Sequence, residues 1–288
     1  MQILVTGGAG FVGSCLIQEL AKDPANEICS LDNYFTGTEE NHVPGVCYIR
    51  GDCRDIATHI KFKPDVVYHF GEYSRVATSF EDYEKVWEYN IAGTHQVLEF
   101  CRHQGSKLIY SASSTKFGDG GHNRDCSPYA FHKAQNTDLI TNYGRWFGLD
   151  YTICYFYNVY GPRQITTGKY ATVIGIFEQQ YLSGEPLTVV KPGTQARSFT
   201  HIDDVVAALM LLRDHGTGDG YCIGTSKNYQ ISEVAKMFTN SIVYLEERPG
   251  ERFVASINLD KMGALGWSPK VELETYIKDF KENKNEVK

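Results

Sequence analysis

The chain of 288 residues lacks an excess of positive charge and any long apolar run. Its formal net charge of −7 argues against a broad nucleic-acid surface, because such binding needs clustered Lys and Arg that displace counterions. The N-terminal run MQILVTGGAG has neither a basic leader nor an apolar segment long enough for a signal peptide or a membrane span. We therefore expect a cytoplasmic protein that binds neither nucleic acid nor membranes.

The sequence also lacks CxxC pairs and the usual metal-binding spacings. Its eight cysteines are scattered, mostly in apolar runs, which indicates free thiols in a reducing compartment. A cysteine hydrolase is a weaker alternative, because no cysteine lies in a recognisable nucleophile motif. His69, His132 and His201 form no HxH or HExxH pattern, so we expect structural or surface roles for them and no metal.

Apolar strands alternate with amphipathic helices through the first half of the chain. The strands are expected in QILVTG, EICSLD, VCYIRGD, DVVYHFG and KLIYSAS, and the helices at 12–22, 84–103 and 127–146. Continuous apolar strands between such helices predict a parallel sheet that is covered on both faces. The expected fold class is therefore α/β, with a doubly wound parallel sheet of the Rossmann type.

The strand in DYTICYFYN continues this pattern, so residues 1–158 are expected to form the Rossmann domain. Beyond it the alternation loosens. We interpret residues 159–288 as mainly a smaller C-terminal substrate-binding lobe, with returns of the chain to the sheet domain near 196–213.

The turn TGGAGFVG follows the first strand and precedes a helix, and it contains Gly7, Gly10 and Gly13 with Phe11 and Val12 between them. Glycines at this spacing allow a tight turn and close approach of a pyrophosphate. The helix N-terminus then offers free N–H groups and a positive dipole to the phosphates. A glycine-rich turn without a ligand remains the alternative if the motif is taken alone.

Asp32 makes the ligand interpretation stronger, because it ends the second strand where a carboxylate meets the adenosine ribose hydroxyls. A carboxylate there repels a 2′-phosphate, so we predict NAD rather than NADP as the cofactor. Asp52 follows the third strand and is expected either to bind the adenine amino group or to be a plain loop carboxylate.

Tyr129 and Lys133 lie four residues apart at the start of a predicted helix, so their side chains share one face. Ser113 ends the strand before that helix. A tyrosine side chain ordinarily ionises near pH 10, but a nearby ammonium and a nicotinium charge both favour the phenolate. We therefore predict that Tyr129 accepts a hydroxyl proton while hydride leaves the substrate carbon. In isolation, a YxxxK pair in a chain with 19 tyrosines would be an exposed helix pair.

Together, TGGAGFVG, Asp32, Ser113, Tyr129 and Lys133, followed by YNVYGPR and FTHIDDVV, resemble the extended short-chain dehydrogenase/reductase family. The resemblance to its nucleotide-sugar epimerase and dehydratase branch, typified by UDP-glucose 4-epimerases, covers nearly the whole chain.

The resemblance implies that Tyr129 is the general base and acid, that Lys133 also holds the nicotinamide ribose, and that Ser113 hydrogen-bonds the substrate oxygen. It implies further cofactor contacts at Asn33, Cys53, Phe70 and Asn90, and substrate contacts at Ser114, Asn158, Arg197 and Arg248. The two arginines would clamp the diphosphate with their guanidinium forks, although a solvated surface charge is the ordinary role of an arginine. The helices near 84–103 and 128–146 would form a homodimer through a four-helix bundle.

The residues after Ser113 select among reactions of this branch. Dehydratases carry an acid there, because loss of water requires protonation of the leaving hydroxyl, and related decarboxylases usually carry Glu at the position of Thr115. This chain has Ser114, Thr115 and Lys116 instead. We therefore predict an NAD-dependent 4-epimerase of a UDP-hexose or N-acetylhexosamine, which needs no extra acid.

Three features depart from the family pattern. Only ten residues separate Gly118 from Tyr129, so one wall of the sugar pocket is expected to be missing or rebuilt. Glu72 stands where relatives have a small residue, and a salt bridge to Arg75 is its expected role. The strand CYFYN lacks the arginine that commonly precedes this stretch.

Two other functions stay open at this point. The first is a 4,6-dehydratase or other keto-sugar enzyme that uses Glu72 as a displaced acid. The second is a non-catalytic NAD-sensing module, although such proteins usually lack the tyrosine or the lysine that this chain retains.

Overall fold

A seven-stranded sheet forms the centre of the molecule, whose computed structural model describes residues 1–286 except 123, 249, 251, 252, 254 and 255. The strand order is β11-β6-β5-β4-β1-β2-β3, and every pair in the sheet is parallel. The strands are β1 (Gln2–Thr6), β2 (Glu27–Asp32), β3 (Cys47–Arg50), β4 (Val66–His69), β5 (Lys107–Ser113), β6 (Tyr151–Phe156) and β11 (Gly218–Ile223). The expected doubly wound parallel sheet is confirmed.

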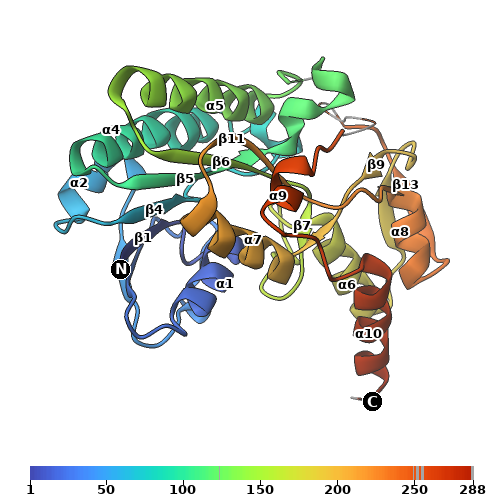
Figure 1. Ribbon diagram of the computed structural model, residues 1–288. Coiled ribbons are helices and arrows are strands. Elements are labelled where there is room, and N and C mark those ends of the chain that lie inside the picture. The colour runs from blue at the N-terminus through green and yellow to red at the C-terminus, as the bar shows by residue number, and fades with distance from the viewer. Residues whose placement is uncertain (123, 249, 251–252, 254–255, 287–288) are drawn as a thin grey trace.

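Helices cover both faces of this sheet (Figure 1). One face carries α2 (Ile56–His59), α4 (Thr94–Gln104) and α5 (Pro128–Phe147), and the other carries α1 (Phe11–Leu20) and α7 (Ile202–His215). Each face has its own apolar core, which explains why the inner strands, such as β1 and β4, are almost entirely buried.

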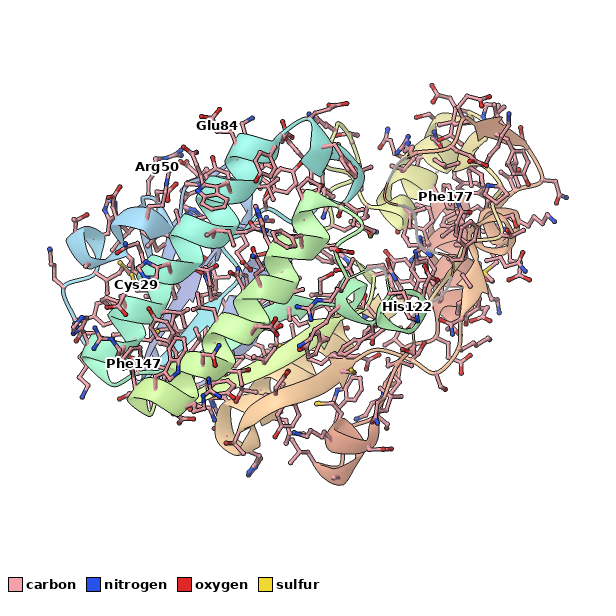
Figure 2. All side chains as sticks on the ribbon, turned by 90° about the horizontal axis from the view of Figure 1, so that it is seen from above. Cys29, Arg50, Glu84, His122, Phe147 and Phe177 are labelled. Carbon is pink, nitrogen blue, oxygen red and sulfur yellow. The ribbon has the colours of Figure 1, made fainter. Side chains whose placement is uncertain are left out.

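Two helical stretches lie side by side over the sheet (Figure 2). The first runs from α3 (Tyr83–Val86) through a π-helical segment at Trp87–Gly93 into α4, and the second is α5. The sequence explains where α5 begins and ends: the Ser127 hydroxyl accepts from the N–H of Ala130, Pro128 occupies the first turn, and Gly148 closes the helix at φ 68°.

A smaller lobe follows the sheet domain. It contains α6 (Val173–Ser183), α8 (Ile231–Phe238) and α10 (Leu273–Glu286), with β8 (Leu187–Val190) parallel to β13 (Ile242–Leu245). Shorter pairs join β9 (Ala196–Arg197) to β12 (Tyr229–Gln230) and β7 (Val159–Tyr160) to β10 (Thr200–His201), and α9 (Asp260–Ala264) packs against β11. The lobe has a separate aromatic-rich core.

The chain returns to the sheet domain for longer than the sequence pattern indicates. After α7 it continues into β11, which pairs with β6 and forms the edge of the sheet. The run GDGYCI was not expected as a strand, because glycines and an aspartate break its apolar pattern.

Within the described part of the chain, no helix combines the length and apolarity that spanning a membrane requires.

Candidate active site

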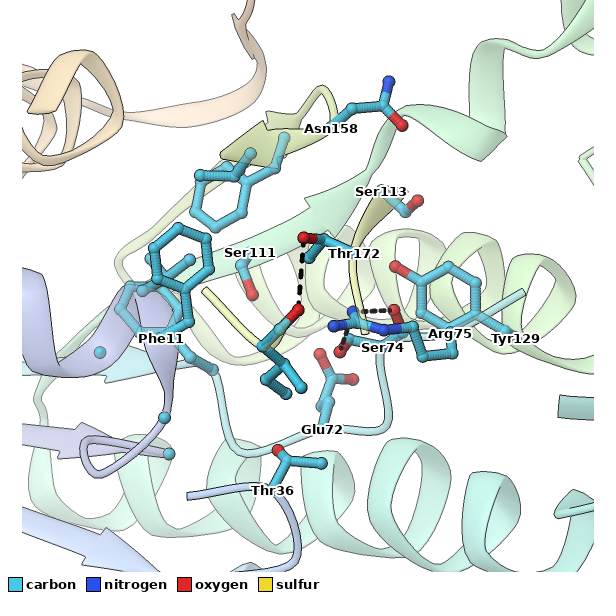
Figure 3. A pocket seen from close by; sticks show the side chains of 18 of the residues that line it. Phe11, Thr36, Glu72, Ser74, Arg75, Ser111, Ser113, Tyr129, Asn158 and Thr172 are labelled. Carbon is cyan, nitrogen blue, oxygen red and sulfur yellow. Dashed lines mark hydrogen bonds between the residues drawn. The ribbon is translucent and has the colours of Figure 1, made fainter. Parts of the chain in front are cut away.

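A cavity of about 410 Å³ opens at the carboxyl edge of the sheet, beside the small lobe. Its lining comes from the loops after β1, β2, β4, β5 and β6 and from the start of α6, as Figure 3 shows from close by. The strand order changes direction between β1 and β4, because β2 and β3 lie on one side of β1 and β4 lies on the other. Ligands of open α/β sheets bind outside the carboxyl ends of the strands at such a point.

The glycine-rich turn forms one end of this cavity. Gly7 has φ +71°, and a Cβ added to it would lie 2.8 Å from the backbone nitrogen of Gly71. A Cβ on Gly13 would lie 2.3 Å from the carbonyl oxygen of Gly7, so both positions require glycine. Gly10 caps α1 without any side chain, and Phe11 and Val12 line the cavity beside it. This open, backbone-lined helix start fits a dinucleotide pyrophosphate.

Asp32 lies at the same end, as the sequence indicates. One carboxylate oxygen accepts from the N–H of Ala9 and the other from the N–H of Tyr34, both at 2.8 Å. Burial raises the pKa of the Asp32 carboxyl above its ordinary value, and these two N–H groups offset part of that effect. The carboxylate is thereby held at the cavity wall with acceptor capacity left for ribose hydroxyls.

Asn33, Asp52 and Cys53 line a small adjoining pocket. Burial alone would raise the pKa of Asp52, but hydrogen bonds from the side chain and backbone of Arg54 lower it below the ordinary value. The carboxylate also caps the short 3₁₀ helix that starts at Cys53. These residues lie where the adenosine half of a cofactor would end, and their contacts with it stay predictions.

Tyr129 and Lys133 face the centre of the site from the first turns of α5. They are 8% and 4% exposed, and Tyr129 lines the cavity whereas Lys133 lies beneath its floor. The Lys133 ammonium donates to the carbonyl oxygen of Ser111 at 2.6 Å. The four-residue spacing in the sequence therefore does bring both side chains to one face of the helix.

Glu72 is the partner of Lys133, and the expected salt bridge to Arg75 is wrong. The carboxylate and the ammonium form a short ion pair, with side chains 1% and 5% exposed. Glu72 and Arg75 both follow β4 and both line the cavity (Figure 3), but Glu72 pairs with Lys133, whereas the Arg75 Nε donates to the carbonyl oxygen of Tyr170. Arg75 is only three positions from Glu72 in the sequence, which suggested it as the partner. The true partner, Lys133, lies in a different element, α5.

Every other contact of the Glu72 carboxylate is also a donor. Oε1 accepts from Thr94 at 2.9 Å and from Tyr110 and Asn136 at 3.0 Å each. The described donors therefore leave both Glu72 oxygens in the acceptor role. Burial and the Glu72 charge raise the pKa of the Tyr110 hydroxyl well above its ordinary value, so this phenol remains a donor to Glu72.

Ser113, Ser114 and Asn158 all line the cavity, in the part formed by the loops after β5 and β6, where the sugar nucleotide is predicted to bind. The Ser113 hydroxyl caps the turn that follows β5, where it accepts from the N–H of Thr115 at 3.3 Å. Asn158 has φ 33°, and its amide donates to the carbonyl oxygen of Ser198 at 2.7 Å. Phe70, from the loop after β4, completes the expected residues that the structure brings together.

Besides Lys133, Asp52 and Cys53, three expected ligand residues lie outside the cavity lining. Asn90 is fully buried, and its amide bonds both backbone groups of Tyr73, so it supports the loop after β4. Arg197 is half-buried on β9, and Arg248 is exposed beyond β13. Their contacts with cofactor or substrate stay predictions.

The short connection before Tyr129 lies outside the cavity lining as far as its residues are described. Among its described residues between Gly118 and Ser127, none faces the cavity. That side is formed instead by Arg75, Val76 and the segment from Ala171 to Ile174. That a wall of the pocket is missing or rebuilt stays a prediction.

Arg75 and Thr172 are cavity residues that the sequence patterns did not single out. For Arg75 a signal existed: a cation follows the fourth strand, at the edge where ligands bind in such sheets. Thr172 caps α6, and threonine before a helix is too common a pattern to indicate a site.

Three features of the structure define its class of protein. They are a parallel Rossmann sheet, a glycine-rich turn that leaves room for a pyrophosphate against the backbone, and a tyrosine–lysine pair on the helix after the fifth strand. They are the features of an extended short-chain dehydrogenase/reductase.

Comparison with known proteins agrees with this class. The model of the NAD dependent epimerase/dehydratase family matches residues 3–224. A putative UDP-glucose 4-epimerase of Methanocaldococcus jannaschii is 32% identical over 296 residues, which cover 96% of each chain. UDP-glucuronic acid decarboxylase 6 of Arabidopsis thaliana is 31% identical over 300 residues, covering 95% of this chain and 85% of that one.

Among solved structures, a UDP-glucose 4-epimerase of Thermus thermophilus in complex with NAD superposes with a TM-score of 0.86 at 30% identity, covering 98% of this chain and 99% of that chain. The chain therefore belongs to the NAD dependent epimerase/dehydratase family, and its cofactor is NAD. The family is enzymatic, with epimerases, dehydratases and decarboxylases among its members.

Proposed function

We propose that this protein is a nucleotide-sugar 4-epimerase. One observation supports the proposal: near Tyr129 and Ser113, the described residues include no carboxylate that is free of a partner. Among the described residues, Asp32 and Glu72 are the carboxylates that line the cavity. Asp32 lies at the cofactor end, and Glu72 is held by Lys133.

The residues suffice for epimerisation. Bound NAD supplies a hydride acceptor that later returns the hydride. Tyr129 takes the proton of the sugar C4 hydroxyl as that carbon is oxidised, and gives it back when the carbon is reduced. Ser113 would hydrogen-bond the same oxygen, and Lys133 would hold the nicotinamide ribose. Inversion then needs only that the 4-keto sugar turn its other face before reduction.

The dehydratase alternative requires Glu72 to protonate a leaving hydroxyl. Four donors, with the Lys133 ammonium among them, already occupy the oxygens of Glu72, so this carboxyl group is not free to approach a leaving hydroxyl. We therefore rank dehydration second. The NAD-sensing module ranks third, because the chain retains both Tyr129, which lines the cavity, and Lys133, which pairs with the lining residue Glu72.

A homodimer through α3, α4 and α5 belongs to the same proposal. Tyr83, Trp87 and Phe131 are 51%, 49% and 44% exposed on these helices. Aromatic rings gathered on neighbouring helices are typical of a contact surface. Light scattering should give the mass of a dimer for the wild type and of a monomer for Trp87→Asp. Equal masses for the two proteins would contradict the proposed dimer surface.

We also propose a cytoplasmic location, from the sequence expectations alone.

NMR of the purified protein with NAD and a panel of UDP-hexoses, UDP-N-acetylhexosamines and UDP-hexuronates tests the reaction. We expect the C4 configuration of one pair to reach equilibrium with no keto sugar accumulating. A keto product without inversion of any substrate would contradict the proposal, and loss of water would support the dehydratase instead.

A further inference from the structure

Arg75 is a charged side chain of the cavity for which the proposed chemistry gives no role. It follows β4, lines the cavity, and reaches toward Ser74 and Tyr129 (Figure 3). Its Nε donates to the carbonyl oxygen of Tyr170 at 2.7 Å, and one Nη donates to Ser74 at 2.9 Å and 3.1 Å. All these acceptors are neutral.

No carboxylate of the described residues forms an ion pair with this guanidinium. The nearest candidate by sequence, Glu72, is bound by Lys133. The groups that act on Arg75 electrostatically are the hydroxyls of Tyr129 and Tyr73, and burial lowers the pKa of the guanidinium.

Arg75 is half-buried and has no carboxylate partner among the described residues, and a planar guanidinium binds carboxylates through two parallel hydrogen bonds. The cavity therefore has an anion-seeking group beside its proposed base.

We propose that Arg75 binds an acidic group of the sugar, and that the substrate class is a nucleotide hexuronate. The inference rests on the proposed function, which puts C4 of the sugar at Tyr129. The substituent of the adjacent carbon C5 is C6, and in a hexuronate C6 is the carboxylate. A guanidinium next to Tyr129 is thus placed for the C6 acid.

This acid has a chemical consequence. Oxidation at C4 puts a ketone two carbons from the carboxylate carbon, so the C5–C6 bond can break, CO₂ can leave, and the electron pair can pass into the enolate of the ketone. An ion pair with Arg75 holds the carboxylate charged and fixes its orientation. Retention or loss of C6 in the product therefore tests which reaction the enzyme catalyses. The affinity for the acidic sugar tests the proposed role of Arg75.

The binding test uses the NAD-loaded Tyr129→Phe protein, in which turnover is blocked, titrated calorimetrically with UDP, UDP-glucose and UDP-glucuronate. We expect UDP-glucuronate to bind about tenfold more tightly than UDP-glucose, the effect typical of a charge-assisted pair. Adding Arg75→Gln should remove that preference and leave UDP binding within about threefold.

Two further variants serve as controls. Arg124→Gln makes the same charge change at the exposed pair with Asp138 and should keep the preference. Arg75→Lys keeps the charge without the fork and should keep part of it. Equal binding of the two sugars by the starting protein would overturn the inference. So would an equal loss for UDP and UDP-glucuronate in Arg75→Gln, which would make Arg75 a phosphate ligand.

Turnover separates this inference from the proposed function. NMR of the wild type with UDP-glucuronate should show inversion at C4 with the carboxylate retained. A UDP-pentose with released CO₂ would contradict epimerisation and leave the acid site supported by the binding data. Inversion of UDP-glucose with no preference for the acid would support the epimerase and contradict the role of Arg75.

Discussion

The two ends of the cavity differ in which atoms form their walls: mainly backbone atoms at one end and mainly side chains at the other. At the cofactor end, backbone atoms and missing side chains set the shape, as the 2.3 Å approach to Gly13 shows. At the sugar end, charged and hydroxyl side chains from β4, β5 and α5 do so, with Glu72 paired to Lys133 and Arg75 left without a carboxylate in the described chain. Under the proposed function, the first end would fix which cofactor binds, and the second would select the reaction and the substrate.

The largest expected effect separates chemistry from cofactor binding. Tyr129→Phe should lower kcat by about a thousandfold, because general acid–base groups contribute about 10² to 10⁴. NAD affinity, measured by calorimetry, should stay within about threefold, since the glycine end is unchanged. Tyr143→Phe, on the same helix outside the cavity, serves as the control and should keep turnover. Unchanged turnover in Tyr129→Phe would refute its catalytic role.

The next effect concerns the pair beneath the sugar end. Glu72→Gln leaves the Lys133 ammonium buried without an anion and should reduce the free energy of unfolding by about 3 kcal/mol. Urea denaturation measures this loss. In the double variant with Lys133→Met the loss should be smaller than the sum of the single losses. Additive losses would show that the two groups do not depend on each other.

A smaller effect is expected at the cofactor end. Gly13→Ala forces a Cβ against the Gly7 carbonyl and should cost about 1–3 kcal/mol of stability, with NAD affinity at least about tenfold weaker. Gly263→Ala is the matched control, because a Cβ there meets nothing within 4 Å. Thermal unfolding and NAD titration distinguish the two. Normal NAD binding by Gly13→Ala would mean that the turn does not hold the pyrophosphate.

The smallest effect concerns the choice of cofactor. Asp32→Asn removes the charge that opposes a 2′-phosphate, so the preference for NAD over NADP should fall by about fivefold, equivalent to about 1 kcal/mol. The ratio of the two dissociation constants measures it. A ratio that does not change would assign the discrimination to another residue.

The same contrast explains what the sequence could predict. The glycine turn, Asp32 and the Tyr129–Lys133 pair were predictable, because each acts within one element or at one strand end. The ion pair of Glu72 was not, since its partner lies 61 positions along the chain and a nearer arginine competed for it. The edge strand β11 was hidden by its glycines, and Arg75 became a candidate only when its contacts proved neutral.

Transfer of a deuterium label at C4 tests the central claim most directly. The purified protein with catalytic NAD is given a UDP-sugar deuterated at C4 in ordinary water, and the product is examined by NMR. The account predicts a C4-inverted sugar that keeps its deuterium at C4, because the same hydride leaves and returns. Deuterium found at C6 with loss of water, or a C4 configuration that never changes, would contradict it.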